Sequence, residues 1–441
     1  MTHSITIKGL DTDLKGYGYL EDKKISFPYV LPGQELKVEE RGRGKRKYYK
    51  ILTPSNYNPE ITGCKYFTHC GGCRARHIPY TSQFKLKVDP LVKFYKNLYN
   101  LNLEILPSDK IDKYRNRMDF AIFPNAIGLR QEGNFRNIID IEECKIQTDK
   151  ANRELKNLRI VLQDFAYNRK TNEGVLKYLT LRVSQKNELL TILTFISSFK
   201  DSDLESKLID ICKNNSIAEN IIFCYNRPKA EVSATGELKV IRGNSYYIEK
   251  FFDIHFEVNF DSFFQPNPSG FTPILNFIEE EIRNHNFKTM VDLFCGGGFF
   301  SLIFGKYFEE ILGYDIINSS ITSARKSLQK AYPEKKVRFE VLDLYSKVLP
   351  ESLESLDEKK TILFVDPPRN GLGEHLIRFI IQLGIEKIFY ISCNPISQKK
   401  DIEMLNENYK ISRGLLIDPY PHTPHLESVL FLEKKHDNEL K

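Results

Sequence analysis

From Phe251 onward, short apolar runs that end in polar residues or glycine recur along the chain. They begin near residues 289, 309, 337, 361 and 387, and each contains β-branched or aromatic side chains. Segments of helical length separate them, which is the pattern of alternating strands and helices in a parallel sheet. Two more apolar runs enclose a polar loop within residues 409–435. The sequence therefore predicts a doubly wound α/β domain over residues 251–441.

The first part of the chain has other patterns. Residues 1–56 contain short β runs punctuated by glycine and proline, which predicts a small β-barrel. Residues 57–250 predict a central α/β domain. It is expected to contain an amphipathic helix over 83–101, a hairpin or meander over 114–141, and two strands around a polar turn over 176–195.

Composition narrows the class of protein. A chain of 441 residues, 41% hydrophobic and 28% charged, has room for two or three folded domains. It shows neither an apolar run of membrane-spanning length nor the apolar core of a secretory signal at its N-terminus, so we expect a cytoplasmic protein. The net charge of +6 is mild and suggests an anionic partner.

One basic stretch sharpens that suggestion. Residues 41–50 read RGRGKRKYYK, a basic tip followed by two tyrosines. Such a tip is either a solvated turn or part of a nucleic-acid surface, in which cations bind phosphates and aromatic rings stack on bases. The chain lacks Trp, so any stacking relies on its 23 Tyr and 30 Phe.

The cysteines suggest a metal centre. Cys64, Cys70 and Cys73 lie within ten residues, with two glycines between the last pair, and Cys144 is a plausible fourth ligand. In a cytoplasmic protein, grouped thiols indicate metal binding or catalysis rather than disulfides. The residues alone leave zinc and an iron–sulfur cluster equally open, and His69 or His77 is an alternative zinc ligand. The remaining isolated cysteines Cys212 and Cys224 are interpreted as packing residues.

Several predicted strands end in residues suited to an adenosyl ligand. Gly296 to Gly298 form a turn that a ligand can approach closely, but the pattern is not the GxGxxG of dinucleotide sites. Asp315 ends the second strand, where a carboxylate can accept hydrogen bonds from the two ribose hydroxyls. Asp343 ends the third strand, where it could contact the adenine amine. Asp366 is fixed by two prolines. Together they favour S-adenosylmethionine as the cofactor.

Cys393 ends the predicted strand that begins at residue 387. A lone cysteine is more often a buried structural residue. Here the upstream strand ends recur at strand–helix spacing and are expected to line one crevice with it, which favours a reactive thiol. Glu427 lies in PHTPHLES and suits a general base beside such a thiol. His422 and His425 in the same segment lack a third ligand, so a metal site there is disfavoured.

The segments FFQPN, DLFCGGG, VDPPRNG, ISCNP and HTPHLES, together with the four grouped cysteines, carry a family resemblance. The chain resembles the RNA uracil-5-methyltransferases that contain an iron–sulfur cluster, over nearly its whole length. The resemblance implies an OB-like TRAM barrel that binds RNA over 1–56, a cluster-bearing central domain over 57–250, and a class I methyltransferase domain over 251–441.

The resemblance also implies roles for single residues. Cys393 is expected to attack carbon 6 of uracil, and Glu427 to remove the carbon 5 proton. The expected residues at the S-adenosylmethionine site are Gln265, Phe294, Asp315 and Asp366. The expected ligands of a 4Fe-4S cluster, with a structural or redox role, are Cys64, Cys70, Cys73 and Cys144. This chain departs from the family in having Asp315 where Glu is common and a third glycine in the glycine loop.

The expected product is 5-methyluridine. We favour uridine 54 in the tRNA T-loop as the target, with a uridine of 23S rRNA as the alternative. A second hypothesis, from another class, is a non-catalytic iron–sulfur protein that binds RNA. We expect a monomer with no membrane association.

Overall fold

The computed structural model describes residues 2–42, 48–52, 62–346, 353 and 355–436. At the N-terminus, two small antiparallel sheets pack together. Their strands are β1 (Thr2–Thr6), β5 (Glu35–Arg41) and β6 (Tyr48–Ile51) in one, and β2 (Gly9–Leu10), β3 (Gly16–Leu20) and β4 (Lys23–Phe27) in the other. The residues buried between them are Ile5, Ile7, Phe27, Val30, Leu36 and Val38.

Close packing explains the glycine at position 18. A Cβ atom there would lie 2.4 Å from Ile5 Cγ2 and 2.6 Å from the Thr6 carbonyl oxygen. The predicted small antiparallel unit is therefore present, while its identity as a TRAM domain stays a prediction. The basic tip at 43–47 lies outside the described residues.

The central region contains a mixed sheet in the order β10-β9-β8-β11-β12-β13-β14. The strands are β8 (Arg117–Phe123), β9 (Ala126–Gln131), β10 (Asn134–Asp140), β11 (Leu176–Val183), β12 (Leu189–Ile196), β13 (Asn220–Asn226) and β14 (Glu237–Arg242). Helices α3 (Asp149–Leu162) and α4 (Asp203–Asn215) begin at hydroxyl caps, Thr148 and Ser202. A short 3-10 turn, η2 (Gln163–Phe165), follows α3, and another, η3 (Ser197–Phe199), precedes α4. The predicted strand pairs in 114–141 and 176–195 are confirmed.

The C-terminal sheet has the order β19-β18-β17-β20-β21-β23-β22-β7 within the described chain. Its strands are β17 (Thr289–Leu293), β18 (Glu310–Asp315), β19 (Lys336–Val341), β20 (Thr361–Val365), β21 (Lys387–Ser392), β22 (Tyr409–Ile417), β23 (Glu427–Lys434) and β7 (Glu104–Leu106). The strands from β19 to β21 run parallel, while β23 is antiparallel to both of its neighbours, β21 and β22.

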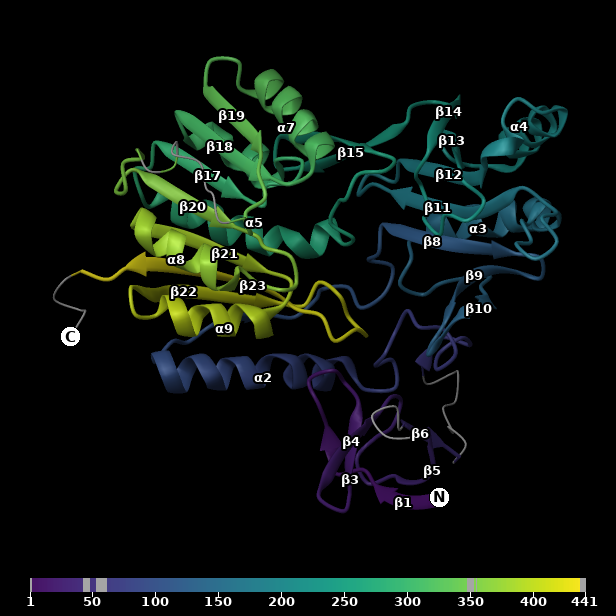
Figure 1. The fold of residues 1–441 in the computed structure, drawn as a ribbon, viewed down its shortest axis with the longest axis horizontal. Helices are drawn as coiled ribbons and strands as arrows, with labels where there is room; N and C mark the ends of the chain where they lie inside the picture. Colours follow the sequence, from purple (N-terminus) through teal and green to yellow (C-terminus); the bar gives the residue numbers. More distant parts are fainter. Residues whose placement is uncertain (1, 43–47, 53–61, 347–352, 354, 437–441) are drawn as a thin grey trace.

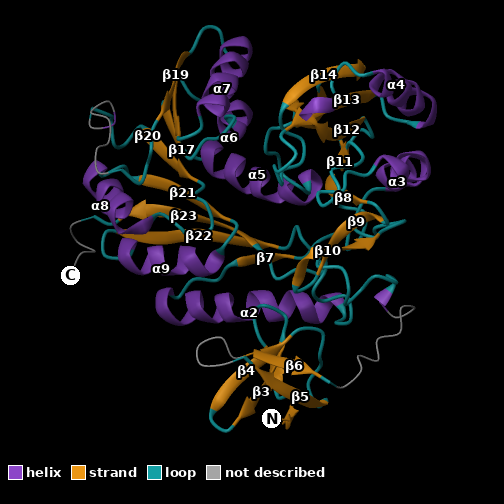
Figure 2. Ribbon diagram, turned by 45° about the vertical axis from the view of Figure 1, so that its right-hand side comes forward, coloured by secondary structure: helices purple, strands orange, loops and turns teal. Residues whose placement is uncertain are grey.

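Helices lie along the parallel strands (Figures 1 and 2). They are α5 (Pro268–Arg283), α6 (Phe299–Phe304) with η4 (Gly305–Tyr307), α7 (Asn318–Ala331), α8 (Gly373–Leu383) and α9 (Pro395–Leu405). The hairpin of β15 (Tyr246–Phe251) and β16 (Ile254–Asn259) precedes them. The predicted doubly wound α/β fold is confirmed.

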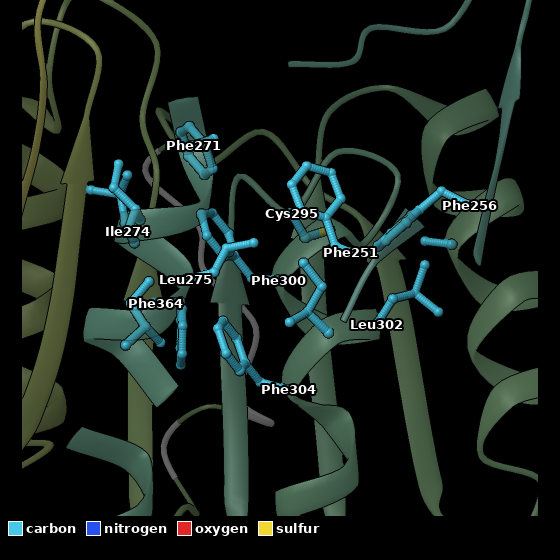
Figure 3. Packing of buried hydrophobic residues seen from close by; sticks show 14 of the residues in the cluster. Phe251, Phe256, Phe271, Ile274, Leu275, Cys295, Phe300, Leu302, Phe304 and Phe364 are labelled. Carbon is cyan, nitrogen blue, oxygen red and sulfur yellow. The ribbon is translucent and has the colours of Figure 1, made fainter. Parts of the chain in front are cut away.

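A phenylalanine-rich core holds α5 and α6 on the sheet (Figure 3). The rings of Phe300, Phe304 and Phe364 lie within 6.5 Å of one another, centroid to centroid. Full burial of each such ring stabilises the fold by about 1.5–3 kcal/mol. Since Phe364 precedes the end of β20 and Phe300 follows the glycine loop, this core fixes the edge of the sheet where ligands bind in such folds.

Residues 80–106 pack with the C-terminal sheet, although they precede the central sheet in sequence. Helix α2 (Tyr80–Tyr99) lies between that sheet and the N-terminal strands (Figures 1 and 2). Its Phe84, Val88 and Leu91 pack against Leu416 and Leu426. Strand β7 then pairs in parallel with the edge strand β22. The predicted limits at 57, 250 and 251 stay predictions, but the C-terminal sheet recruits residues from beyond them.

Among the described residues, none of the helices is both long enough and apolar enough to cross a membrane.

Candidate active site

The carboxyl edge of the parallel sheet brings three of the predicted residues to one level. In the strand pairing, Leu293 lies beside both Tyr314 and Val365. Phe294, Asp315 and Asp366 are the next positions on their strands, so they stand side by side at this edge. Phe294 has a left-handed backbone (φ 63°) and its ring lies 5.6 Å from that of Tyr345. The three residues therefore lie together at the carboxyl edge of the sheet.

The glycine loop closes against Asp315. The Gly296 N–H donates to one Asp315 carboxylate oxygen (3.0 Å), and the Ile317 N–H donates to the other (2.9 Å). Gly296 has φ 52°, which suits glycine, and no atom lies within 4 Å of the Cβ that a side chain would add at Gly296 or Gly297. The loop thus presents bare backbone to open space beside a fixed carboxylate.

A second carboxylate lies beneath this edge. Asp292 is fully buried in β17, where it accepts a hydrogen bond from the Ser301 hydroxyl (2.6 Å). Burial raises the pKa of both Asp292 and Asp366 to about 7, and each is raised further by a neighbouring acid, Asp366 by Asp292. Two carboxyl groups that lie close together do not readily ionise at the same time. Asp292 and Asp366 are therefore expected to retain a proton near neutral pH.

Cys393 and Glu427 face each other across adjacent strands. The antiparallel strands β21 and β23 end their pairing with Ser392 opposite Ser428. Cys393 follows Ser392 and Glu427 precedes Ser428, so the same register makes them the next facing pair. Directly opposed residues have Cβ atoms about 5 Å apart. The sheet therefore places the Cys393 thiol and the Glu427 carboxyl group close to each other at its edge.

Both groups lie in a poorly solvated, acidic site. Burial raises the pKa of the Cys393 thiol to about 11, the charges of Glu427 and Asp366 add to the rise, and Arg369 opposes it. Burial, followed by the charge of Asp366, raises the pKa of Glu427 well above its ordinary value, while Arg369 and a hydrogen bond from Tyr420 oppose the rise. Perturbed groups that converge at the edge of a sheet are typical of active sites.

Two residues of this site were not predicted from the sequence. Arg369 lowers the pKa values of both Cys393 and Glu427, and its Nη2 lies 3.1 Å from the ring nitrogens of His425. Tyr420 also lowers the pKa of Glu427. The sequence signals were the basic residue that follows Asp-Pro-Pro and the aromatic residue ahead of the two histidines, but neither is specific without the fold.

Gln265 belongs to a segment that adjoins the approach to Glu427. Its carbonyl accepts a hydrogen bond from Asn116 Nδ2 (3.0 Å), and Asn267 Nδ2 donates to the carbonyl of Pro419 (2.7 Å). The neighbouring side chain of Phe263 is 80% exposed. The segment thus links the central region to the loop that precedes Glu427.

The four grouped cysteines converge and form no disulfide. Burial is the main reason that the pKa of Cys70 is raised to about 11 and that of Cys73 to about 12. The charges of Cys64 and Cys144 contribute to the rise at Cys70, and Cys144 also acts on Cys73. All four thiols are free and half-buried. Within the described chain, however, we find no three His, Cys, Asp or Glu residues grouped closely enough to hold a single metal ion.

The nearby histidines have other partners. The ring of His77 packs against those of Phe67 and Tyr29, at 5.4 and 6.3 Å between centroids. The His69 ring lies 3.3 Å from the Phe67 carbonyl oxygen. In the C-terminal loop, the His422 Nδ1 lies 3.1 Å from Gln83 Nε2, and its Nε2 lies 3.8 Å from the Asp112 carboxylate. These contacts favour the thiols as the donor set.

Known proteins resemble the chain over its whole length. The family model described as tRNA (Uracil-5-)-methyltransferase matches residues 79–435. An uncharacterized RNA methyltransferase of Leptospira interrogans is 43% identical over 444 residues, covering 99% of this chain and 98% of the relative. A tRNA (uracil(54)-C(5))-methyltransferase of Pyrococcus furiosus is 30% identical, covering 96% of this chain and 97% of the relative.

A solved structure agrees with the fold. The crystal structure of the Pyrococcus abyssi tRNA (uracil-54, C5)-methyltransferase in complex with S-adenosyl-L-homocysteine superimposes with a TM-score of 0.74. It is 26% identical and covers 98% of this chain and 100% of its own. This match confirms the predicted class I methyltransferase fold. The strand order, the facing thiol and carboxyl groups, and the family model lead to one assignment: the chain belongs to the tRNA (uracil-5-)-methyltransferase family of enzymes.

Proposed function

We propose that this enzyme methylates carbon 5 of a uracil in RNA, with uridine 54 of tRNA as the preferred target and S-adenosylmethionine as the methyl donor. The observation that carries the proposal is the proximity of Cys393 and Glu427, which adjoin the last pair of β21 and β23, at the sheet edge that also holds Phe294, Asp315 and Asp366. The names of the Pyrococcus relatives support uridine 54. A large-subunit rRNA uridine stays the alternative target.

The residues at the sheet edge suit the proposed methyl donor. Asp315 is held by two backbone N–H groups in the position from which an acid accepts ribose hydroxyls in related sheets. The glycine loop leaves the space that a ligand needs for close approach. Phe294 offers an apolar ring, and Asp366 and Gln265 offer polar groups. S-adenosylmethionine supplies an electrophilic methyl group.

Carbon 5 of uracil is a weak nucleophile, so the ring needs activation. Cys393 reacts as the thiolate, the form that the charge of Arg369 favours, after its proton has been lost to solvent. The thiolate sulfur forms a bond to carbon 6, and the electron pair of the carbon 5–carbon 6 double bond moves toward the carbonyl at carbon 4. The resulting enolate takes the methyl group at carbon 5. Glu427 then removes the carbon 5 proton, the double bond returns, and the carbon–sulfur bond breaks. A raised pKa makes Glu427 a stronger base for this step.

The proposed 4Fe-4S cluster fits the chemistry of the donor set. Four free thiols approach one another without a competing disulfide, and soft thiolates are the ligands of iron–sulfur clusters. A single zinc ion would bring sulfur atoms within about 4 Å of each other, given Zn–S distances of about 2.3 Å. A four-iron cluster is larger than a single ion, and its ligand atoms lie farther apart. The cysteines can therefore suit a cluster although no group of ligands in the described chain is close enough to bind a single metal ion.

Replacing Cys70 by serine is expected to lower the iron and acid-labile sulfide bound per chain, because serine is a poor ligand for such clusters. Iron analysis and the visible absorbance of anaerobically purified protein measure the effect. The matched control is Cys212→Ala, which removes a buried thiol in α4, away from the four cysteines, and is expected to keep its iron. Unchanged iron in Cys70→Ser protein would contradict the assignment of this ligand.

Phe263 is proposed to stack on a base of the RNA. An exposed aromatic ring two residues before Gln265 suits an unstacked base, and such stacking is worth about 1–3 kcal/mol. Phe263→Ala is therefore expected to raise the KM for RNA by roughly tenfold, with little change in the affinity for S-adenosylhomocysteine. Ile160→Ala, at a residue of α3 that is 76% exposed, is the control. Equal KM values for the two variants would remove Phe263 from the RNA site.

The proposed function is tested by incubating the purified protein with labelled S-adenosylmethionine and separate tRNA and rRNA transcripts. The modified nucleoside is then mapped by mass. Label at uridine 54 of tRNA is expected. Label confined to rRNA would keep the chemistry and overturn the preferred target, whereas the absence of 5-methyluridine in both RNAs would refute the proposal.

A further inference from the structure

The base Glu427 is delivered by a long loop, residues 418–426, which connects β22 to β23. The loop contains Tyr420, which lies close enough to Glu427 to lower the pKa of its carboxyl group, and His425, which contacts Arg369. Its His422 has a left-handed backbone (φ 66°), a conformation that is unfavourable for a non-glycine residue and needs support from its surroundings. The loop therefore depends on contacts from elsewhere in the chain.

Helix α2 supplies much of that support from one buried face. Gln83 and Lys87 are four residues apart, so they lie on the same side of the helix, and both are buried. The Gln83 Oε1 accepts a hydrogen bond from the His422 N–H (2.9 Å), and its Nε2 lies 3.1 Å from the His422 ring. The same Nε2 donates to the carbonyls of Ala75 and Ile78. One side chain thus links the loop to the segment that follows Cys73.

Lys87 supports the two ends of the loop. Its ammonium group forms a fully buried ion pair with Asp418 (2.7 Å). It also lies 3.4 Å from the carbonyl oxygen of Tyr420 and 3.3 Å from that of His425. Burying a charged pair costs desolvation free energy, and fixing one geometry is the best-supported use of such pairs. Because the Lys87 ammonium group contacts three groups of one loop, it is suited to fixing the conformation of that loop.

Other residues complete the enclosure. The carbonyl of His422 accepts hydrogen bonds from the N–H groups of Arg74 (2.7 Å) and Ala75 (3.1 Å). The Tyr114 hydroxyl donates to the carbonyl of Pro421 (2.9 Å). All of these partners lie before residue 115, so the loop that leads into Glu427 is supported in part by a segment of the chain that contributes no reacting group.

We propose that Gln83 and Lys87 are positioning residues for the catalytic base, acting through the loop 418–426 that carries Tyr420 and leads into Glu427. The inference rests on the proposed function. A misplaced Glu427 slows removal of the carbon 5 proton but leaves the attack of Cys393 and the methyl transfer intact. The methylated RNA then remains joined to the Cys393 sulfur, since the carbon–sulfur bond breaks only after that proton has left.

The test uses the full-length protein and compares Gln83→Met with Lys93→Met. Gln83→Met removes the contacts to His422 without burying an unpaired charge. Lys93→Met changes an exposed residue of the same helix and should behave like the unmodified protein. We expect kcat to fall by about ten- to a hundredfold in Gln83→Met, because misplacing a reacting group by about 1 Å costs up to about 10²-fold.

The diagnostic readout is the fraction of enzyme joined to RNA in a denaturing gel during turnover. This fraction should rise in Gln83→Met, while the affinity for S-adenosylhomocysteine stays as in Lys93→Met. A second variant, Lys87→Met combined with Asp418→Asn, removes both buried charges together and should show the same rise. Normal kcat and normal adduct in either variant would overturn the proposal, and so would a loss of kcat without added adduct.

The two hypotheses fail in different ways. If the unmodified protein gives neither 5-methyluridine nor an adduct, the proposed function is wrong. If the unmodified protein gives both, and Gln83→Met behaves like Lys93→Met, only the positioning role is wrong.

Discussion

Replacing Cys393 by alanine is expected to abolish methyl transfer to RNA, with a loss of at least about 10³-fold in kcat. Without the sulfur, no bond forms at carbon 6 and carbon 5 stays too weak a nucleophile to accept the methyl group. The variant should still bind S-adenosylhomocysteine, because Cys393 leaves β21 beyond the level of Phe294, Asp315 and Asp366. Incorporation of labelled methyl groups into tRNA, together with calorimetric titration of the ligand, measures both properties.

Cys224→Ala serves as the control, since it removes a buried thiol from β13 in the central sheet. It should methylate RNA at nearly the unmodified rate and form the same covalent adduct. Full methyl transfer by the Cys393→Ala protein would refute the assignment of the nucleophile. The folded state of both variants is checked by their thermal unfolding.

Replacing Glu427 by glutamine is expected to separate methyl transfer from product release. The amide cannot take the carbon 5 proton, so the first uracil is methylated but remains bonded to Cys393. Loss of a general base costs about 10²–10⁴-fold in turnover. A denaturing gel should therefore show a stoichiometric protein–RNA band that carries the labelled methyl group, while multiple-turnover kinetics show a single burst.

Glu433→Gln is the matched control, because Glu433 lies on the same strand, paired with Lys387 at the far end from the site. It should turn over normally and show little adduct. Normal turnover by the Glu427→Gln protein would show that another group acts as the base. One that forms no adduct would show that Glu427 acts before methyl transfer.

The sequence predicts the individual strand ends well. Apolar runs followed by glycine, Asp or Cys define where β17, β18, β20 and β21 stop, and in parallel strands such ends meet at one edge. For this reason the local pattern alone predicts that Asp315, Asp366 and Cys393 lie at the carboxyl ends of their strands, and the structure places them there. Their chemical roles came from the family resemblance, because burial and charge at the site depend on the folded chain.

The remaining features depend on contacts that no local pattern encodes. Strand β7 is only three residues long and gains its place by pairing with β22. Arg369 and Tyr420 look like ordinary surface residues until the loops after β20 and β22 meet. In the sequence, Lys87 looks like any other lysine of an amphipathic helix. Its ion-pair partner Asp418 lies 331 residues further along the chain, so no local pattern indicates the pair.

That separation has a consequence for synthesis of the protein. At about 5–20 residues per second, roughly 15 to 65 seconds pass between the translation of Lys87 and that of Asp418. During this interval α2 has made neither its buried ion pair nor its contacts with Leu416 and Leu426. The apolar surface that these leucines cover therefore stays exposed to solvent until the end of the chain has been translated. We expect the nascent chain to be prone to aggregation through this surface until its last strands emerge, and a chain that ends before residue 418 lacks both Asp418 and Glu427.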